Sequence, residues 1–339
     1  MCYHIVPNYY SFVAIQVHKV ADEIIMDFTD QINLLENKYQ KAVKDLYTQL
    51  TPVQLLHIAC HPNRPTFLDH VLNITDKWVE LHGGCAAYDD PAIVLGIESI
   101  DGKSYMLIGH RKGRNTKEHI QRNFGMLTPH GYWKTLHMMK YADHHGFPII
   151  TFIDTPGAFS DLRSEELGQG KAIAFNLRAM FGVKIPIVTV VIGEGGSGGA
   201  LAIGCANKLY MLENSVFYVA SPEACAAILW KTSQEAPKVH ALHHYTATKL
   251  CNLKIADGII PVRQPFSYVN ECYNSLFLEF FYCVIQELGG MDKDSLLNMQ
   301  HMKFWVLGGF VEGEHVEPEI KRNMKKKEAD VPQVTADIC

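Results

Sequence analysis

The chain has 339 residues, of which 47% are hydrophobic and 20% charged, a composition typical of a globular protein with one large or two ordinary domains. Its formal net charge of −5 argues against nucleic acid as the main partner. Nine cysteines, an odd number without a C-x-x-C pair, favour reduced thiols over a disulfide framework or a zinc site. We therefore expect no metal ion in this chain.

The first part of the chain is predicted to be helical. Apolar residues spaced by three and four predict a helix that begins at Thr29 or Asp30 and runs to about Leu50. A second helix is predicted over "PTFLDHVLNITDKWVELHG" (65–83), which ends in glycine as helices often do. We expect residues 1–88 to form an N-terminal helical extension. Its first residues contain no arginine and little serine, so no transit peptide is evident.

Strands and helices alternate from Pro91 onwards. Two apolar runs around Asp101-Gly102 predict a hairpin. The buried strands "FPIITFID" and "IPIVTVVIG" follow, separated by a helix from about Ser164 to Phe181, and then the strands "KLYMLE" and "VFYVAS". This alternation predicts an α/β domain over 89–261. Residues 262–339 are predicted to be a divergent helical region with a basic tail.

Six glycines lie in the fifteen residues "VVIGEGGSGGALAIG", directly after a buried strand. Gly193, Gly195 and Gly198 match the dinucleotide-binding pattern G-x-G-x-x-G, although the helix that follows is short for a βαβ crossover. Alternatively, this segment acts together with "DTPGA" (154–158), which follows another buried strand. Both segments would then open on one edge of the sheet, with backbone N–H groups converging on an oxygen that becomes negative during a reaction.

Several long motifs decide between these interpretations. The segments "RKGRNTKEHIQRNFGM", "PIITFIDTPGA", "SEELGQGKAIAFNLRAMFG", "VIGEGGSGGALAIG" and "SPEACAAILWKT" resemble the alpha subunits of the acetyl-CoA carboxylase carboxyltransferase, most of all the plastid form of plants. The resemblance runs from about Ala21 to Pro261. It implies a crotonase-like α/β fold, a spiral of ββα units, preceded here by the helical extension. It also implies a location in the chloroplast stroma.

The resemblance implies an activity and a set of partners. In this family, carboxybiotin on its carrier protein gives its carboxyl group to acetyl-CoA, and the product is malonyl-CoA. A beta subunit completes the active site, biotin carboxylase belongs to the same system, and an alpha2beta2 hetero-oligomer is expected. The substrates are therefore carboxybiotin and a coenzyme A thioester, with no metal in this chain.

The resemblance also implies which residues act. The N–H groups of Gly199 and Ala200, in the first turn of a helix, would stabilise the ureido oxygen of biotin, with Gly157 or Ala158 as a second donor. Three further glycines would let the ring approach closely: Gly195, Gly196 and Gly198. Ser197 is expected to cap the helix rather than act as a nucleophile.

A basic cluster, formed by Arg111, Lys112, Arg114 and Lys117, has two interpretations. It would bind the phosphates of coenzyme A or acidic groups of the beta subunit, since arginine recognises both phosphate and carboxylate. It is equally consistent with a solvated loop.

The chain departs from the family pattern at several positions. Cys60 and Trp133 stand where the family usually has arginine, Gly84-Cys85 where it has Asp-Arg, and Lys171 where glutamate is common. The sequence from Val262 onwards resembles no part of the family. These departures leave two alternatives open: a non-catalytic assembly subunit of the same complex, and, from the glycine pattern, a dinucleotide- or ATP-binding enzyme.

Overall fold

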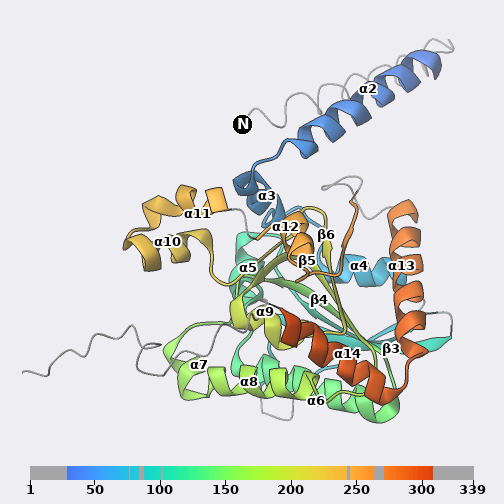
Figure 1. Ribbon diagram of the computed structural model, residues 1–339, viewed down its shortest axis with the longest axis vertical. Helices are drawn as coiled ribbons and strands as arrows, with labels where there is room; N and C mark the ends of the chain where they lie inside the picture. Colours follow the sequence, from blue (N-terminus) through green and yellow to red (C-terminus); the bar gives the residue numbers. More distant parts are fainter. Residues whose placement is uncertain are drawn as a thin grey trace, which may run out of the picture.

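The computed structural model describes residues 29–75, 77–83, 88–100, 102–242, 245–262 and 271–307. Within these ranges the centre of the molecule is an eight-stranded sheet with helices on both faces (Figure 1). The strand order is β1-β2-β3-β4-β5-β6-β8, and β7 pairs with the end of β5. No helix in the described ranges is both long and apolar enough to span a membrane.

The sheet combines an antiparallel and a parallel part. β1 (Lys77–Glu80), β2 (Ile93–Ile100) and β3 (Lys103–His110) are antiparallel neighbours. The other strands run parallel to their partners: β4 (Ile149–Thr155), β5 (Ile187–Gly196), β6 (Lys208–Leu212), β7 (Val216–Tyr218) and β8 (Gly258–Ile260). The predicted hairpin is confirmed, and Gly102 takes the left-handed φ of 74° that its tight turn requires.

Alternate residues of the central strands point into two cores, as the two-residue period of a strand dictates. Ile149 and Ile153 of β4 face one core, and Ile150 and Phe152 face the other. The first core is covered by α6 (Pro129–His145), α8 (Gln169–Met180) and α9 (Ser197–Gly204). The second is covered mainly by α4 (Phe67–Ile74) and α13 (Glu271–Gly289). Both faces of the central strands are therefore buried from solvent, which agrees with the continuous apolar sequences that predicted these strands.

The remaining helices lie around this framework. α2 (Thr29–Thr48) extends away from the sheet, as Figure 1 shows. The others are α3 (Pro52–Ala59), α5 (Thr116–Gln121), α7 (Leu162–Glu166), α10 (Pro222–Trp230), α11 (Ala236–Leu242), α12 (Ala247–Asn252) and α14 (Lys293–Val306), with short 3-10 turns η2 (Asn123–Gly125) and η3 (Ser233–Glu235).

Three local predictions are wrong. The helix predicted over 65–83 ends at Ile74, and the following strand β1 pairs with β2, so tertiary pairing overrides the helical pattern there. The helix predicted from Ser164 to Phe181 is two helices, α7 and α8, separated at Gly168, which has a left-handed φ of 82°. The glycine segment is not a loop, because β5 continues through Gly196 and α9 begins at the next residue.

Candidate active site

Two backbone segments meet at the carboxyl edge of the sheet, after β4 and β5. These strands are parallel neighbours, so the residues that follow them lie at the same edge. A Cβ atom on Gly199 would lie 2.5 Å from the nitrogen of Ala158 and 2.6 Å from the carbonyl carbon of Gly157. A Cβ atom on Gly196 would lie 1.9 Å from the carbonyl oxygen of Pro156. The two segments therefore touch backbone to backbone, at positions that only glycine allows.

The structure distinguishes between the two candidate donors after β4. The N–H of Gly157 donates to the Thr155 hydroxyl at 3.2 Å, and that hydroxyl donates in turn to the Gly157 carbonyl at 2.7 Å. The N–H of Gly157 is therefore already engaged. The nitrogen of Ala158 is the atom that lies against Gly199, so Ala158 is the better placed candidate.

The start of α9 decides which of its N–H groups are available. The helix begins at Ser197, so Gly198 and Gly199 are its second and third residues, whose N–H groups have no partner four residues back within the helix. Ala200 lies in the first turn, as predicted. Because it is the fourth residue of the helix, its N–H already has the Gly196 carbonyl as its acceptor within the helix. Ser197 follows the N-cap residue Gly196 and has a φ of 55°, so its predicted role as the cap is wrong.

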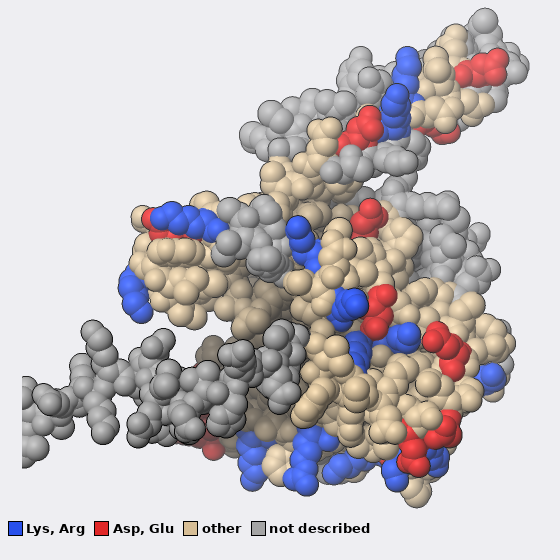
Figure 2. Space-filling view, viewed as in Figure 1, with Lys and Arg blue, Asp and Glu red and all other residues tan. Residues whose placement is uncertain are grey.

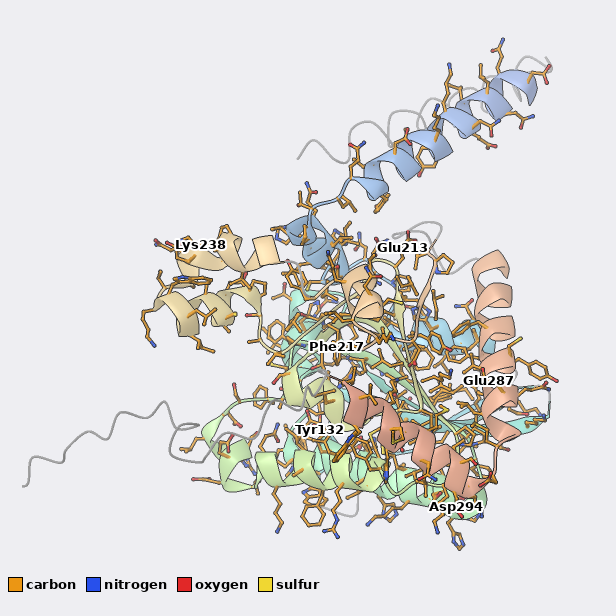
Figure 3. The ribbon with its side chains drawn as sticks, in the orientation of Figure 1. Tyr132, Glu213, Phe217, Lys238, Glu287 and Asp294 are labelled. Carbon is orange, nitrogen blue, oxygen red and sulfur yellow. The ribbon has the colours of Figure 1, made fainter. Side chains whose placement is uncertain are left out.

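The glycines of the dinucleotide pattern have a different use. Gly193 and Gly195 lie inside β5. A Cβ atom on Gly193 would lie 2.2 Å from Oδ1 of Asp154, and one on Gly195 would lie 2.2 Å from the ring of Phe217, which is labelled in Figure 3. The space beside these two glycines is filled by the side chains of Asp154 and Phe217. It is therefore not open to a phosphate group, and the geometry does not support a phosphate-binding loop.

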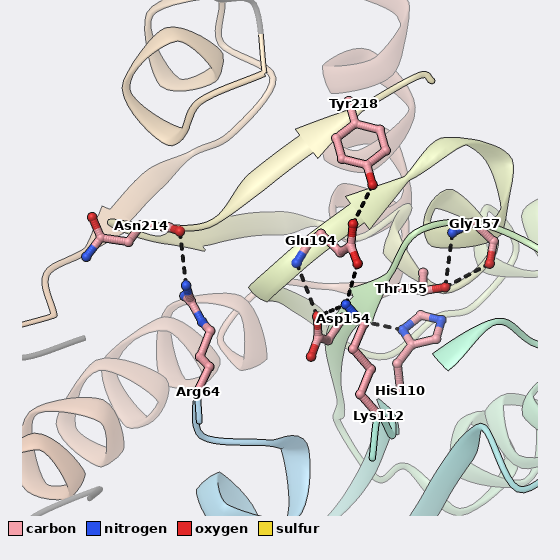
Figure 4. Close-up of polar contacts among 9 residues, drawn as sticks. All are labelled: Arg64, His110, Lys112, Asp154, Thr155, Gly157, Glu194, Asn214 and Tyr218. Atoms are coloured by element: carbon pink, nitrogen blue, oxygen red, sulfur yellow. Dashed lines mark hydrogen bonds and ion pairs between the residues drawn. The ribbon is translucent and has the colours of Figure 1, made fainter. Parts of the chain in front are cut away.

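A buried ionic cluster, not predicted from the sequence, lies at the ends of β4 and β5, just before the two segments, and Figure 4 shows it beside Thr155 and Gly157. The Lys112 ammonium is paired with the carboxylates of Asp154, at 3.0 Å, and of Glu194. The Tyr218 hydroxyl donates to Oε2 of Glu194 at 2.5 Å, and the Glu194 N–H donates to Oδ1 of Asp154 at 3.2 Å. The side chains of Lys112, Asp154 and Glu194 are only 10–12% exposed.

The pairing favours the charged forms of Glu194 and Lys112. Burial acts to raise the pKa of Glu194, but Lys112 and the hydrogen bond from Tyr218 outweigh it and hold the pKa below its ordinary value. Burial acts to lower the pKa of Lys112, and the charges of Asp154 and Glu194 outweigh it, so the pKa is raised. One ammonium thus faces two carboxylates.

The predicted basic cluster is divided among different environments. Lys112 is buried in the ionic cluster. Arg114 is paired with Asp69 at the surface, and its side chain is 62% exposed. Arg111 is half-buried, and its backbone N–H donates to the carbonyl of Ala92 at 2.8 Å. Lys117 is exposed, so Lys112 alone of the four predicted residues is withdrawn into the buried ionic cluster.

The positions that depart from the family pattern have identifiable surroundings. Cys60 lies beside the ionic cluster, with Glu194, Lys112 and Asp154 as its charged neighbours. The ring of Trp133 packs against Phe175, with centroids 5.5 Å apart, and the Lys171 ammonium lies 6.0 Å from the centre of the same Phe175 ring. Gly84 and Cys85 lie outside the described residues. Among the residues that are described, no group of three or more His, Cys, Asp or Glu side chains is placed to hold a metal ion.

Curated relatives share one name. The chain is 62% identical over 316 residues to "Acetyl-coenzyme A carboxylase carboxyl transferase subunit alpha, chloroplastic" of Arabidopsis thaliana, covering 93% of this chain and 41% of that protein. It therefore spans about two fifths of the length of this plant relative. It is 43% identical over 298 residues to the carboxyl transferase subunit alpha of Synechocystis, covering 88% of this chain and 91% of the relative.

Solved structures agree on the fold. The beta subunit of Pseudomonas aeruginosa geranyl-CoA carboxylase superposes with a TM-score of 0.53 at 18% identity, over 72% of this chain and 46% of that one. Transcarboxylase 12S superposes with a TM-score of 0.51 at 16% identity, over 74% of this chain and 43% of that one. At these identities the likeness concerns the fold alone, and the crotonase-like fold expected from the sequence is confirmed.

A family model covers most of the chain. The model described as "Acetyl co-enzyme A carboxylase carboxyltransferase-like" matches residues 13–308. The match continues past Pro261, so the expectation that the sequence from Val262 onwards resembles no part of the family is wrong. This match includes every segment of the site described above, from Cys60 to Tyr218. The chain therefore belongs to the acetyl-coenzyme A carboxylase carboxyltransferase-like family.

Proposed function

We propose that this chain supplies the alpha side of a carboxyltransferase that moves the carboxyl group of carboxybiotin, held on its carrier protein, to acetyl-CoA. The product is malonyl-CoA for fatty acid synthesis. Membership of the family supports the reaction class. The observation that carries the proposal is the contact between Gly199 and Ala158, which aligns two backbone segments at the carboxyl edge of the sheet.

The chemistry needs a place for negative charge. When the N–CO2 bond of carboxybiotin breaks, the charge moves to the ureido oxygen of biotin. The N–H groups of Ala158 and Gly199 are the donors that the geometry favours for this oxygen, while Gly157 and Ala200 have acceptors within the chain. The open space beside Gly198, where an added Cβ would meet nothing closer than 3.8 Å, suits the approach of the ring. One donor of this kind typically contributes about 3 to 4 kcal/mol to the transition state.

The same proposal includes the partners and the location. A beta subunit would complete the active site, and a biotin carboxyl carrier protein and a biotin carboxylase would supply the carboxyl group. We expect an alpha2beta2 hetero-oligomer. The names of the plant relatives support a location in the chloroplast stroma.

Two matched glycine variants test the donor assignment in the chain co-expressed with a plastid-type beta subunit. Gly199→Ala should lower the rate of malonyl-CoA formation about 10²- to 10³-fold, because the added methyl group forces the Ala158 backbone away. Gly170→Ala, in the first turn of α8, should retain most of the activity, because an added Cβ there would meet nothing within 4 Å and Gly170 has no part in the proposed site. Equal losses in the two variants would contradict the assignment. Malonyl-CoA formation by the purified chain without a beta subunit would contradict the shared active site.

A second candidate function follows from the departures at Cys60, Trp133 and Lys171. A chain that has lost charges of this kind would serve as a non-catalytic assembly subunit of the same complex. In that case the chain binds the beta subunit in a stable complex, and the complex forms no malonyl-CoA. Size measurement of the co-expressed complex, followed by the transferase assay, separates the two functions.

A further inference from the structure

The pairing of β4 with β5 is irregular where the site begins. Ile153 pairs with Val191, and the next pair is Thr155 with Gly195, so β5 advances four residues while β4 advances two. The regular ladder of backbone hydrogen bonds is interrupted between these two pairs. The interruption lies immediately before both segments of the proposed site.

The carboxylate of Asp154 fills this interruption. Its Oδ1 accepts the backbone N–H of Glu194 at 3.2 Å and the Lys112 ammonium at 3.0 Å. Gly193 leaves the space that this oxygen needs, since a Cβ atom there would lie 2.2 Å from it. A side-chain carboxylate thus replaces a ladder bond between the two strands.

Lys112 makes this arrangement possible. Without its ammonium, the carboxylates of Asp154 and Glu194 would face each other from adjacent strand ends with little access to water. Breaking a buried pair by removing one partner is strongly destabilising, because an uncompensated charge stays buried. Lys112 follows β3, so a single cation joins the ends of β3, β4 and β5, and Tyr218 extends the cluster to β7.

The stem of Lys112 is also held in place. Gly125, in η2, has a left-handed φ of 79°, and a Cβ atom on it would lie 3.0 Å from Cγ of Lys112 and 2.8 Å from the Asp154 carbonyl oxygen. The backbone of η2 therefore packs closely over both residues. The ammonium has little freedom to leave the two carboxylates.

We propose that Lys112 is a positioning residue, which sets the separation of the segment 156–158 from the start of α9 by holding the carboxylates that precede them. Asp154 comes three residues before Gly157, and Glu194 five residues before Gly199. Displacement of either strand end would move the backbone donors apart. This inference rests on the proposed function for its consequence in catalysis, but the positioning itself is a property of this chain.

The test compares Lys112→Met and Lys112→Arg with Lys134→Met in the complex with the beta subunit. Lys134 is a matched control, because it is also a buried lysine, 1% exposed, and its ammonium is paired with Asp89 at 2.6 Å. Lys112→Met should lower kcat about 10²-fold with little change in the KM for acetyl-CoA, since a misplacement of about 1 Å can have an effect of this size. Lys112→Arg should recover part of the loss, and Lys134→Met should keep kcat within a few-fold of the wild type.

A second readout does not depend on activity. Amide hydrogen exchange in peptides covering 154–159 and 194–200 should become faster in Lys112→Met and stay unchanged in Lys134→Met. If the wild-type complex makes no malonyl-CoA, the proposed function fails while the exchange experiment still decides the positioning role. Unchanged exchange in Lys112→Met overturns the inference.

A milder variant covers the case in which Lys112→Met does not fold. Tyr218→Phe removes only the hydroxyl that donates to Glu194. It should give a smaller increase in exchange in the peptide 194–200 and none in peptides from α6. An exchange pattern identical to that of the wild type in Tyr218→Phe and in Lys112→Arg overturns the inference in that case.

Discussion

Cys60 lies beside an ionic cluster that contains one more negative than positive charge. Its charged neighbours are Glu194, Lys112 and Asp154. The residue itself is exposed at the end of α3. An uncharged thiol stands at the position where the resemblance to the family led us to expect arginine, beside two carboxylates and one ammonium.

A residue-scale prediction follows for Cys60→Arg. The added guanidinium should raise the free energy of unfolding of this chain by about 0.2 to 1 kcal/mol, the range of an exposed ion pair. Urea unfolding of the two proteins measures the difference. Cys60→Gln is the control, since it adds a polar side chain without charge. The same stability in the arginine and glutamine variants would contradict an electrostatic origin.

The site could be predicted from the sequence only in its outline. An apolar strand followed by glycines appears twice, which predicted two segments at one edge of the sheet. Lys112 and Glu194 are 82 residues apart in the chain, and no local pattern joins them. The available signal was an acidic residue at the end of each buried strand, in "FID" and "VIGE". The sequence also did not predict that α9 begins at Ser197, which makes Ala200 the fourth helical residue, with the Gly196 carbonyl as the acceptor for its N–H.

At the scale of elements, α6 and α8 are joined by an aromatic contact. Trp133 of α6 and Phe175 of α8 are in ring contact, and Lys171 lies near the same Phe175 ring, four residues earlier in α8. Figure 2 shows Lys and Arg side chains along the lower edge of the molecule, where Figure 1 places these two helices. Lys140, Lys171 and Arg178 are the exposed basic residues of α6 and α8. The two departures from the family at Trp133 and Lys171 therefore share one neighbour.

This contact predicts that the two departures are coupled. Trp133→Arg alone should lower the free energy of unfolding by about 1 kcal/mol or more, because it removes the ring contact and adds a cation to a basic surface. Combined with Lys171→Glu, part of the loss should be recovered, with a coupling energy of at least about 0.5 kcal/mol in a double-mutant cycle. Strictly additive effects would show that the two positions do not interact.

Elements formed by local patterns were easier to predict than elements formed by pairing. The hairpin of β2 and β3 and the parallel strands β4 and β5 follow from apolar runs and a glycine turn. β1 does not, since its four residues continue a helical pattern and become a strand only by pairing with β2. The end of β5 has the same origin, because Glu194, Gly195 and Gly196 pair with β7.

At the scale of the whole molecule, two buried histidines link stability to pH. Burial lowers the pKa of His70 to about 4, with Arg64 also lowering it and Asp69 opposing. Burial lowers the pKa of His110 to about 3, with Lys112 acting in the same direction. His70 lies on α4, and His110 at the end of β3, where its Nδ1 accepts the Asp154 N–H at 3.4 Å. Both histidines are neutral in the folded chain at neutral pH.

The folded chain should therefore lose stability as the pH falls from about 6.5 to 4.5. In this range the unfolded chain, whose histidines have an ordinary pKa of about 6.5, binds protons that the folded chain excludes, so each of the two residues lowers the free energy of unfolding by about 1.4 kcal/mol per pH unit. The lowered pKa values of Glu194 and Asp69 add to the loss only below about 4.5, the ordinary range of carboxyl groups.

Urea unfolding at a series of pH values measures the slope. His110→Asn keeps an acceptor for the Asp154 N–H and removes one titrating group, so its slope between pH 6 and 4.5 should be clearly smaller than that of the wild type. A slope equal to that of the wild type would mean that His110 is not the group that binds the proton on unfolding.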